Sequence, residues 1–194
     1  MLRFRFLSDQ SAFAFARAML RTLLGGYLDV PPDRLSFHNS ELGKPALRSP
    51  WSESHVHFNL SHTQGAVLVG VCLGRQIGAD IELIREDFEV EDIATRFFSA
   101  QEQNALSEFA PGRARRQAFF RCWTRKEAWL KARGSGLSFP LRDFDVSIAA
   151  AESEVLLVTR PDAEEARRWL ILDGRAPVGY AAAVAISQSP SYSG

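Results

Sequence analysis

The chain has 194 residues, 46% of them hydrophobic, which is enough to bury a core as one domain or as two small lobes. Its 23 basic residues balance 23 acidic ones, so no overall basic field points to nucleic acid, and we expect no nucleic-acid partner. No apolar run is long enough to span a bilayer, and the N-terminal MLRFRFLSDQ lacks the features of a secretory signal, so we expect a cytoplasmic protein without a membrane partner.

The first half of the chain predicts a helix followed by a small antiparallel sheet. Apolar residues recur at helical spacing from Ser11 to Leu24, and the Gly-Gly pair that follows is expected to close the helix. A tight turn at residues 74–76 is expected to join the last two of four strand-like runs. These runs are Leu35 to His38, Val56 to Leu60, Ala66 to Leu73 and Ile77 to Leu83.

The second half repeats this order of helices before strands. VEDIATRFF has helical signals, and Ser99 with Glu102 three positions later fits a capping box for the next helix. A long helix is predicted from about Arg113 to Ala132, with Gly134 placed to stop it. Strand-like runs return at Phe144 to Ile148, Val155 to Thr159, Trp169 to Leu172 and Val178 to Ile186, and residues 188–194 are expected to be a disordered tail.

These patterns predict an α+β fold of two lobes. The predicted hairpin at 66–82 has a loose counterpart at 169–186, which indicates two similar lobes with antiparallel sheets packed by helices. We place the N-terminal lobe at 1–78 and the C-terminal lobe at 79–187.

Two carboxylates stand one residue apart in GADIE, at the end of an apolar strand. Because side chains alternate along a strand, Asp80 and Glu82 share one face. With Glu127 they would supply three carboxylates, the ligand type that magnesium accepts. The alternative is that Asp80 and Glu82 simply project into solvent.

CWTRKEAWLKARGSGL is the second unusual stretch. On a helix, Glu127 and Lys131 share a face, with Trp123 and Lys126 one turn earlier. An ordinary exposed Glu–Lys pair would give the same pattern. Only three of the 23 basic residues are lysines, however, and two of them lie here.

Three further features are weaker signals. Lys44, the third lysine, lies between a glycine and a proline, which presents its ammonium from a fixed loop. Ser61 and His62 offer a hydroxyl and an imidazole that can hold a phosphate. A Ser/His/Asp hydrolase is disfavoured because adjacent strand side chains point apart and no GxSxG motif exists. His55, His57 and His62 fit half-buried strand residues better than a metal site, and the widely separated Cys72 and Cys122 argue against structural zinc.

Taken together, GKP, FNLSH, GADIE, RFFS and WTRKEAWLKARGSGL resemble the Sfp-type 4'-phosphopantetheinyl transferases in their tryptophan/KEA variant. The resemblance runs from about Leu20 to Leu141 and takes in all three lysines. It implies a pseudo-dimer of two α+β lobes, with coenzyme A and magnesium in the cleft between them. The implied enzyme is a monomer that transfers 4'-phosphopantetheine from coenzyme A to a serine of an apo carrier protein and releases 3',5'-ADP.

The same resemblance implies a role for each candidate site residue. Asp80, Glu82 and Glu127 would be the magnesium ligands. Lys44, Ser61 and His62 would hold the 3'-phosphate end of coenzyme A, and Lys126 and Lys131 would lie against its pyrophosphate. Glu127 and Lys131 would be catalytic, as acceptor of the serine proton and stabiliser of the leaving group. Phe97, Phe98 and the helix after Ser99 would dock the carrier protein.

The sequence departs from the family pattern at its start. Larger relatives carry a further N-terminal strand with basic residues that contact coenzyme A, which here only four arginines, Arg3, Arg5, Arg17 and Arg21, can replace. Of these, Arg17 is the candidate for the coenzyme A site. Two alternatives remain open: a magnesium-dependent phosphohydrolase that acts on a coenzyme A-like pyrophosphate, and a non-catalytic binder of carrier proteins.

Overall fold

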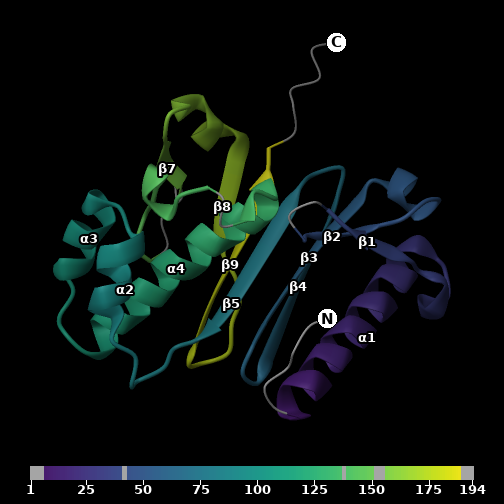
Figure 1. Cartoon of the computed structure of the whole chain (residues 1–194), viewed down its shortest axis with the longest axis horizontal. Helices are drawn as coiled ribbons and strands as arrows, with labels where there is room; N and C mark the ends of the chain where they lie inside the picture. The colour runs from purple at the N-terminus through teal and green to yellow at the C-terminus, as the bar shows by residue number, and fades with distance from the viewer. Residues whose placement is uncertain (1–6, 41–42, 137–138, 151–155, 189–194) are drawn as a thin grey trace.

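Two separate clusters of buried hydrophobic residues divide the molecule into two lobes (Figure 1). The computed structural model describes residues 7–40, 43–136, 139–150 and 156–188. The smaller cluster includes Leu20, Leu24 and Phe58, and the larger one is built around the helix that carries Phe119 and Trp129. The predicted α+β class with antiparallel sheets is therefore confirmed.

The N-terminal lobe packs one long helix against a hairpin. Helix α1 buries Ala16, Leu20 and Leu24, and it contacts β3. Strands β3 and β4 pair antiparallel, as do the short strands β1 and β2. The bounds are α1 Leu7–Leu28, β1 Phe37–Asn39, β2 Pro45–Leu47, β3 Val56–Thr63 and β4 Ala66–Leu73.

Helix α1 does not end at the Gly-Gly pair, as the sequence suggested. It continues to Leu28, and the chain leaves the helix at Asp29, which has a positive φ of 52°. Gly25 instead permits a close approach, because a Cβ there would lie 2.7 Å from the carbonyl oxygen of Val30. A glycine in a helical pattern is a packing device here rather than a stop signal.

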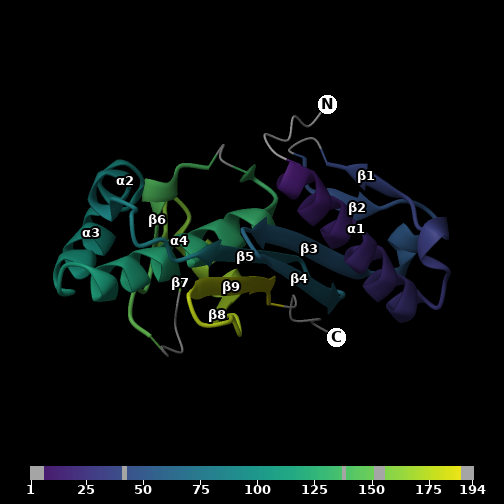
Figure 2. The same cartoon turned by 90° about the horizontal axis from the view of Figure 1, so that it is seen from below.

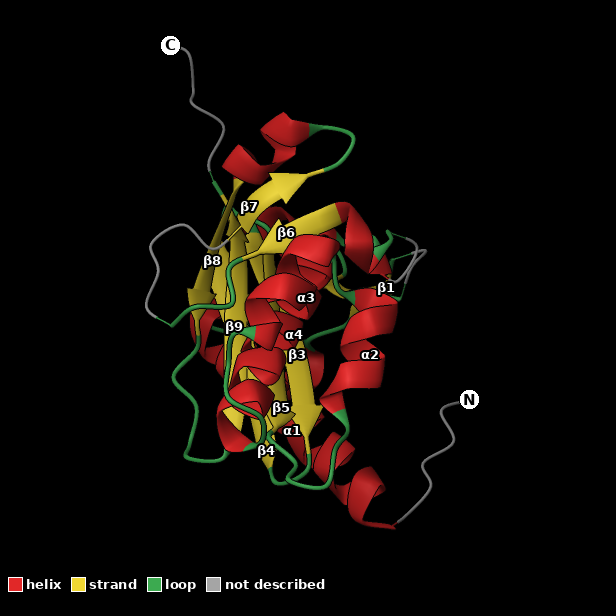
Figure 3. Cartoon of the chain, turned by 90° about the vertical axis from the view of Figure 1, so that its left-hand side faces the viewer, coloured by secondary structure: helices red, strands yellow, loops and turns green. Residues whose placement is uncertain are grey.

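The C-terminal lobe places a three-stranded sheet, in the order β5-β9-β8, against helix α4. Helices α2 and α3 lie at the outer end of this lobe, beside the N-terminal part of α4 (Figure 3). Strands β6 and β7 form a separate antiparallel pair. The bounds are β5 Ile77–Leu83, α2 Val90–Phe97, α3 Ala100–Ser107, α4 Arg113–Arg133, β6 Phe144–Val146, β7 Leu156–Thr159, β8 Trp169–Asp173 and β9 Tyr180–Ser187. Short 3-10 helices occur at Pro32–Arg34, Trp51–Ser54, Leu141–Asp143 and Ala163–Arg168.

The predicted hairpin at 66–82 is wrong. Strand β4 pairs with β3, whereas β5 crosses into the C-terminal lobe and pairs with β9. The turn at Gly74, whose φ is 71°, therefore joins two lobes rather than two paired strands. The predicted boundary between residues 78 and 79 falls inside β5.

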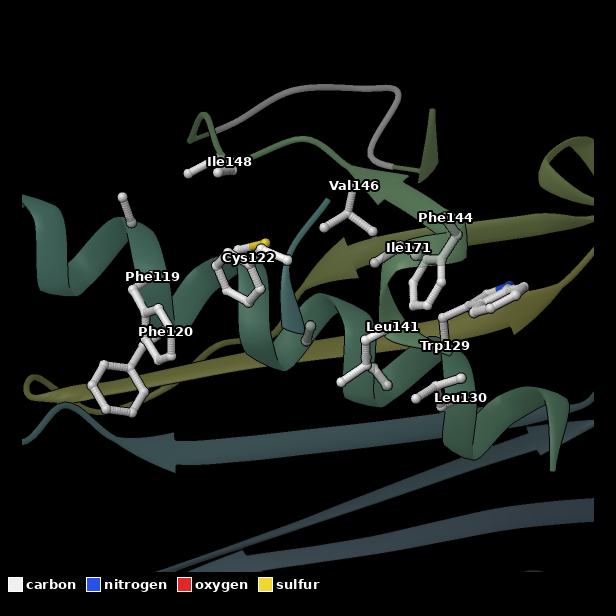
Figure 4. Packing of buried hydrophobic residues seen from close by; sticks show 14 of the residues in the cluster. Phe119, Phe120, Cys122, Trp129, Leu130, Leu141, Phe144, Val146, Ile148 and Ile171 are labelled. Atoms are coloured by element: carbon white, nitrogen blue, oxygen red, sulfur yellow. The ribbon is translucent and has the colours of Figure 1, made fainter. Parts of the chain in front are cut away.

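The helix signals of the second half are confirmed. Ser99 and Glu102 form both hydrogen bonds of the capping box, and Gly134 ends α4 in the left-handed conformation. Aromatic residues of α4 fill the core of this lobe together with Phe144 and Ile171 from the strands (Figure 4). The predicted tail lies outside the described residues except for Gln188, and so does Val155. In the described part of the chain, no helix is both long and apolar enough to cross a membrane.

Candidate active site

The two lobes meet along a seam where β3 and β5 run side by side (Figure 2). Side-chain oxygens from every second residue of β3 accept hydrogen bonds from backbone N–H groups of β5, at distances of 2.8, 3.4 and 3.4 Å. The pairs are Asn59 with Ala79, Ser61 with Ile81, and Thr63 with Leu83. The sequence separation between the two partners is the same in all three pairs, which means that the two strands are parallel. We call this arrangement the β3–β5 seam.

An ion pair between a buried acid and a half-buried lysine lies at the middle of the seam. The Lys131 Nζ of α4 donates to Asp80 Oδ1 over 2.5 Å and to Ser61 Oγ over 3.1 Å, and the Ser61 hydroxyl donates to the same Asp80 oxygen over 3.0 Å. Asp80 is 2% exposed, and its second oxygen, Oδ2, is buried with no hydrogen-bond partner. Lys131 thus pairs with the strand acid and not with Glu127 one turn earlier.

Helix α4 reaches the seam because of Gly78. A Cβ at this position would lie 2.1 Å from the carbonyl oxygen of Ala128 and 2.2 Å from the backbone nitrogen of Ala132. Only glycine lets the helix cross the strand so closely. The close crossing brings Glu127 and Lys131 of α4 to the acids of β5.

The neighbouring acids and burial shift the pKa values of Glu82 and Glu127. Burial raises the pKa of Glu82, and the charge of Asp80 raises it further, although Thr63 donates a hydrogen bond to Glu82 Oε2 over 3.3 Å. Burial also raises the pKa of Glu127, and the charges of Asp80 and Glu82 add to this effect while Lys131 opposes it. The three predicted metal ligands therefore lie close enough to repel one another.

The donor chemistry of these acids fits a hard cation. Carboxylate oxygens are the ligands that magnesium takes, and the orphaned Asp80 Oδ2 is a buried acceptor that lacks a partner. Among the described residues, no three His, Cys, Asp or Glu side chains are already gathered as a metal site. In this arrangement the Lys131 ammonium supplies the positive charge beside Asp80.

A cavity opens at each end of the seam. At the start of β3, a cavity of about 450 Å³, here the lysine cavity, is lined by residues that include Lys44, His57, Gln76 and Arg133. At the end of β3, a cavity of about 480 Å³, here the aromatic cavity, is lined by Thr63, Glu82 and Arg85 together with apolar side chains that include Phe97 and Trp123. The charged cluster lies between them.

Lys44 bridges the two lobes from the lysine cavity. Its Nζ donates to the carbonyl oxygens of Ile77 and Ala132, over 3.0 and 3.1 Å. Burial lowers its pKa to about 8. His57 faces the same cavity, and burial together with the Lys44 charge lowers the pKa of its imidazole.

Family models match almost the whole chain. The model of the 4'-phosphopantetheinyl transferase superfamily matches residues 76–185, and that of the 4'-phosphopantetheinyl transferase N-terminal region matches residues 1–72. The chain belongs to the 4'-phosphopantetheinyl transferase superfamily. The two matches meet at the turn between β4 and β5, where the chain passes from one lobe to the other.

Individual relatives agree with this family. The chain is 36% identical to the 4'-phosphopantetheinyl transferase HetI of Nostoc sp. over 95% of this chain and 74% of the relative. It is 36% identical to the 4'-phosphopantetheinyl transferase psf-1 of Bacillus pumilus, over 76% of this chain and 60% of that protein. The chain also matches the structure of Thermotoga maritima holo-[acyl-carrier-protein] synthase with a TM-score of 0.46 and 19% identity, over 59% of this chain and 64% of that chain. The family resemblance is confirmed, while the tryptophan/KEA subdivision stays a prediction.

One predicted site residue of this transferase family member lies elsewhere. Lys126 is 0% exposed, so the prediction that it contacts the coenzyme A pyrophosphate does not hold in this structure. Its Nζ pairs with Glu102 at 2.6 Å and donates to the carbonyl oxygens of Leu141 and Phe144, over 2.8 and 2.6 Å. On a helix, Lys126 points about 100° away from its neighbour Glu127 and so into the core of the lobe.

The residues predicted to hold the 3'-phosphate are not brought together. Ser61 is buried against Asp80, whereas His62 points to the other side of β3 and packs edge-on against Phe13 of α1, with ring centroids 6.4 Å apart. Arg17 lies on that side too, 5.6 Å from the centre of the Phe13 ring. Lys44 lines the cavity at the start of β3 together with His57. His57 and His62 are five residues apart, which is about 16 Å along a strand.

Sequence reasoning missed Asn59, Thr63 and Gly78. The signal was present in the strand FNLSHT, where every second residue carries a short polar side chain although the strand is half-buried. Such a row of acceptors marks a strand whose edge faces another strand without a backbone ladder. Gly78 belonged to the quoted GADIE run, but its role needs the position of α4.

Proposed function

We propose that the chain transfers the 4'-phosphopantetheine group of coenzyme A to a serine of an apo carrier protein, with magnesium, and releases 3',5'-ADP. The observation that carries the proposal is the order along the seam: the lysine cavity, then the cluster of Asp80 and Lys131, then the aromatic cavity. Coenzyme A has the same order of an anionic nucleotide, a pyrophosphate and an uncharged arm.

The nucleotide end fits the lysine cavity. The Lys44 ammonium supplies positive charge there, and the half-buried site strengthens its attraction for a phosphate. Arg133 also lines the cavity, although its guanidinium is paired with Glu165 over 2.7 Å. Ser61 has a different role in this proposal from the one expected, because it orients Asp80 and Lys131 by hydrogen bonds. His62 and Arg17 remain candidate contacts on the α1 side of β3.

The pantetheine arm and the incoming serine fit the aromatic cavity. Phe97 and Trp123 line it and lie edge-to-face, with ring centroids 5.9 Å apart. Phe97 also belongs to the region expected to dock the carrier protein, so the serine would enter beside Glu82 and Glu127.

In the proposed reaction, the serine oxygen forms a bond to phosphorus and the bond from that phosphorus to the bridging oxygen breaks. Glu127 accepts the serine proton, directly or through water, and its raised pKa suits a general base. Lys131 stabilises the charge that develops on the departing 3',5'-ADP, or protonates it. Asp80, Glu82 and Glu127 would hold the magnesium ion, which when bound supplies charge stabilisation at the phosphoryl oxygens.

We further propose that the chain acts as a monomer in the cytoplasm. Both lobes of the seam, and every residue of the proposed site, belong to one chain, so a second copy is not needed to complete it.

The decisive experiment incubates the protein with coenzyme A, magnesium and a panel of apo carrier proteins, followed by intact mass spectrometry. We expect at least one carrier to gain the mass of one phosphopantetheine group. A matched carrier with its acceptor serine changed to alanine is the control.

Two other outcomes would overturn the proposal. Consumption of coenzyme A in the absence of any carrier would indicate the phosphohydrolase. Carrier binding without a mass gain on any carrier would indicate a non-catalytic binder.

A further inference from the structure

A group of arginines lines two adjoining cavities at the N-terminal end of α4. The cavities have volumes of about 540 and 280 Å³ and share Ile84, Gln117, Ala176 and Tyr180 in their walls, so we treat them as one and call it the arginine cavity. Three guanidinium groups from α4 line it, those of Arg113, Arg116 and Arg121.

The arginine cavity is separate from the seam. It lies where β5 and β8 end and β9 begins, under the first half of α4, with the loop at 174–179 on its far side. Residues from the last position of β5 onward alternate between the two sites: Leu83 and Arg85 line the aromatic cavity, whereas Ile84 and Glu86 line the arginine cavity. The two cavities share this segment as a wall but have no lining residue in common.

The positive charge of the arginine cavity is not neutralised by the protein. Asp173 is engaged by Arg125 through two hydrogen bonds of 2.8 and 2.9 Å. Arg121 donates to the carbonyl oxygen of Ile148 over 2.9 Å. In the described part of the chain, no carboxylate lies within ion-pair distance of Arg113, Arg116 or Arg121. Two acids, Asp173 and Glu86, are among the described residues that line the cavity, and Asp173 is already paired with Arg125. Glu86 therefore remains to balance three guanidinium groups.

The start of α4 adds to this positive charge. The first turn of α4 has no acidic residue, and its N-cap Gly112 makes no side-chain cap, so arginines stand at the positive end of the helix dipole. Burial and the nearby Arg125 charge lower the pKa of Arg121, and the charge of Asp173 opposes this effect only in part.

We propose that the arginine cavity binds a small polyanion, a ligand with at least two phosphate or carboxylate groups. Guanidinium forks recognise both groups through paired hydrogen bonds. The volume of the cavity is in the range of small-molecule sites. A polyanion would neutralise the three arginines.

The test is isothermal titration of pyrophosphate and, separately, of citrate into the full chain, with EDTA present so that no metal complex forms. Arg113→Ala/Arg116→Ala is the test variant, and Arg34→Ala/Arg48→Ala, which removes two exposed arginines of the other lobe, is the matched control. Lys44→Ala removes the lysine cavity as a competing anion site.

We expect the wild type and the Arg34/Arg48 variant to bind alike, and the Lys44 variant to retain the binding that depends on Arg113 and Arg116. The Arg113/Arg116 variant should show this binding at least about tenfold more weakly. Loss of fold is not expected in this variant, because removing positive charge from the first turn of α4 favours the helix, and a thermal melt checks this. Binding of pyrophosphate alone would identify a phosphate ligand, binding of citrate alone a polycarboxylate. Failure of both anions to bind the wild type, or equal binding by the Arg113/Arg116 variant, would overturn the proposal.

Discussion

At the scale of single residues, Asp80 determines the electrostatics of the site. One of its oxygens accepts from Lys131 and Ser61, while the other is buried without a partner. A buried carboxylate oxygen without a donor is costly, and a bound cation would relieve this cost. Asp80 is therefore the residue of the seam that is best placed to bind a cation.

We predict that Glu127→Gln lowers the transfer rate by about a hundred- to ten-thousand-fold, the usual contribution of a positioned general base. Stability should not fall, because burial and the charge of Asp80 already disfavour the ionised form of Glu127. Carrier loading followed over time by intact mass measures the rate. The exposed Glu108→Gln is the control, and near wild-type transfer by Glu127→Gln would show that Glu127 is not the base.

Lys44 gives a prediction about pH. Its pKa of about 8 means that the ammonium loses its proton as the pH rises through that value, so coenzyme A should bind more weakly above pH 8 than at pH 7. Arginine stays charged over this range, so Lys44→Arg should remove this pH dependence. Dissociation constants measured between pH 6.5 and 9.5 test this, and an unchanged slope in the variant would exclude Lys44 from the site.

Lys126 should matter for stability rather than for substrate binding. Lys126→Met leaves Glu102 as a buried charge without its partner, which costs on the order of 3–5 kcal/mol in the free energy of unfolding. Urea unfolding measures this loss. Adding Glu102→Gln to this variant should restore part of the lost stability. A Lys126→Met protein that is stable but has a raised KM for coenzyme A would instead indicate that Lys126 contacts the substrate.

At the scale of elements, the crossing of β5 and α4 determines whether the acids meet the lysine. We predict that Gly78→Ala destabilises the protein by about 1–3 kcal/mol, because the new methyl group would overlap backbone atoms of α4. Gly26→Ala is the matched control, since a Cβ there meets nothing within 4 Å, and it should be neutral or stabilising by about 1 kcal/mol. Equal thermal melts for the two variants would contradict the close crossing.

Local signals predicted the helices better than the strand partners. The Ser99 capping box and the Gly134 stop are read from neighbouring residues, and both are present in the structure. The pairing of β5 with β9 joins residues a hundred positions apart, which no local pattern encodes, so the expected hairpin with β4 was wrong. The short β2 at Pro45–Leu47 was missed for a different reason: it pairs locally with β1, but its three residues are too few to show an alternating pattern.

The candidate site shows the same division between local and distant information. Alternation along one strand placed Asp80 and Glu82 on a common face, where the structure has them beside α4. Lys126 was placed at the pyrophosphate by the family resemblance, whereas helical periodicity, which turns adjacent residues apart, directs it away from Glu127 to its partner Glu102. Ser61 and His62 were grouped in the same way, despite the alternation that separates them.

At the scale of the whole molecule, the acids of the seam should make stability depend on pH. The pKa values of Glu82 and Glu127 are raised above 4.5 in the folded protein, so the fold binds these protons more tightly than the unfolded chain does. The stability that protonation provides is present at low pH and is lost as the pH rises from 4.5 through the raised values.

We therefore predict that Glu82→Gln/Glu127→Gln is more stable than the wild type at pH 8, and that this difference disappears towards pH 4.5. Unfolding in urea at several pH values measures it. Magnesium should stabilise the wild type at pH 8 but not the variant, because a ligand that binds only the folded state adds to its stability. If magnesium stabilised both proteins equally, Glu82 and Glu127 would not be its ligands.

The side-chain links of the seam also set a width. Strands joined by a backbone ladder lie about 4.8 Å apart, and no substrate can enter between them. Here an amide and two hydroxyls act as spacers between β3 and β5. The lengths of the side chains at positions 59, 61 and 63 therefore determine the distance between β3 and β5. Single substitutions at these positions would change this distance without removing backbone hydrogen bonds from either sheet.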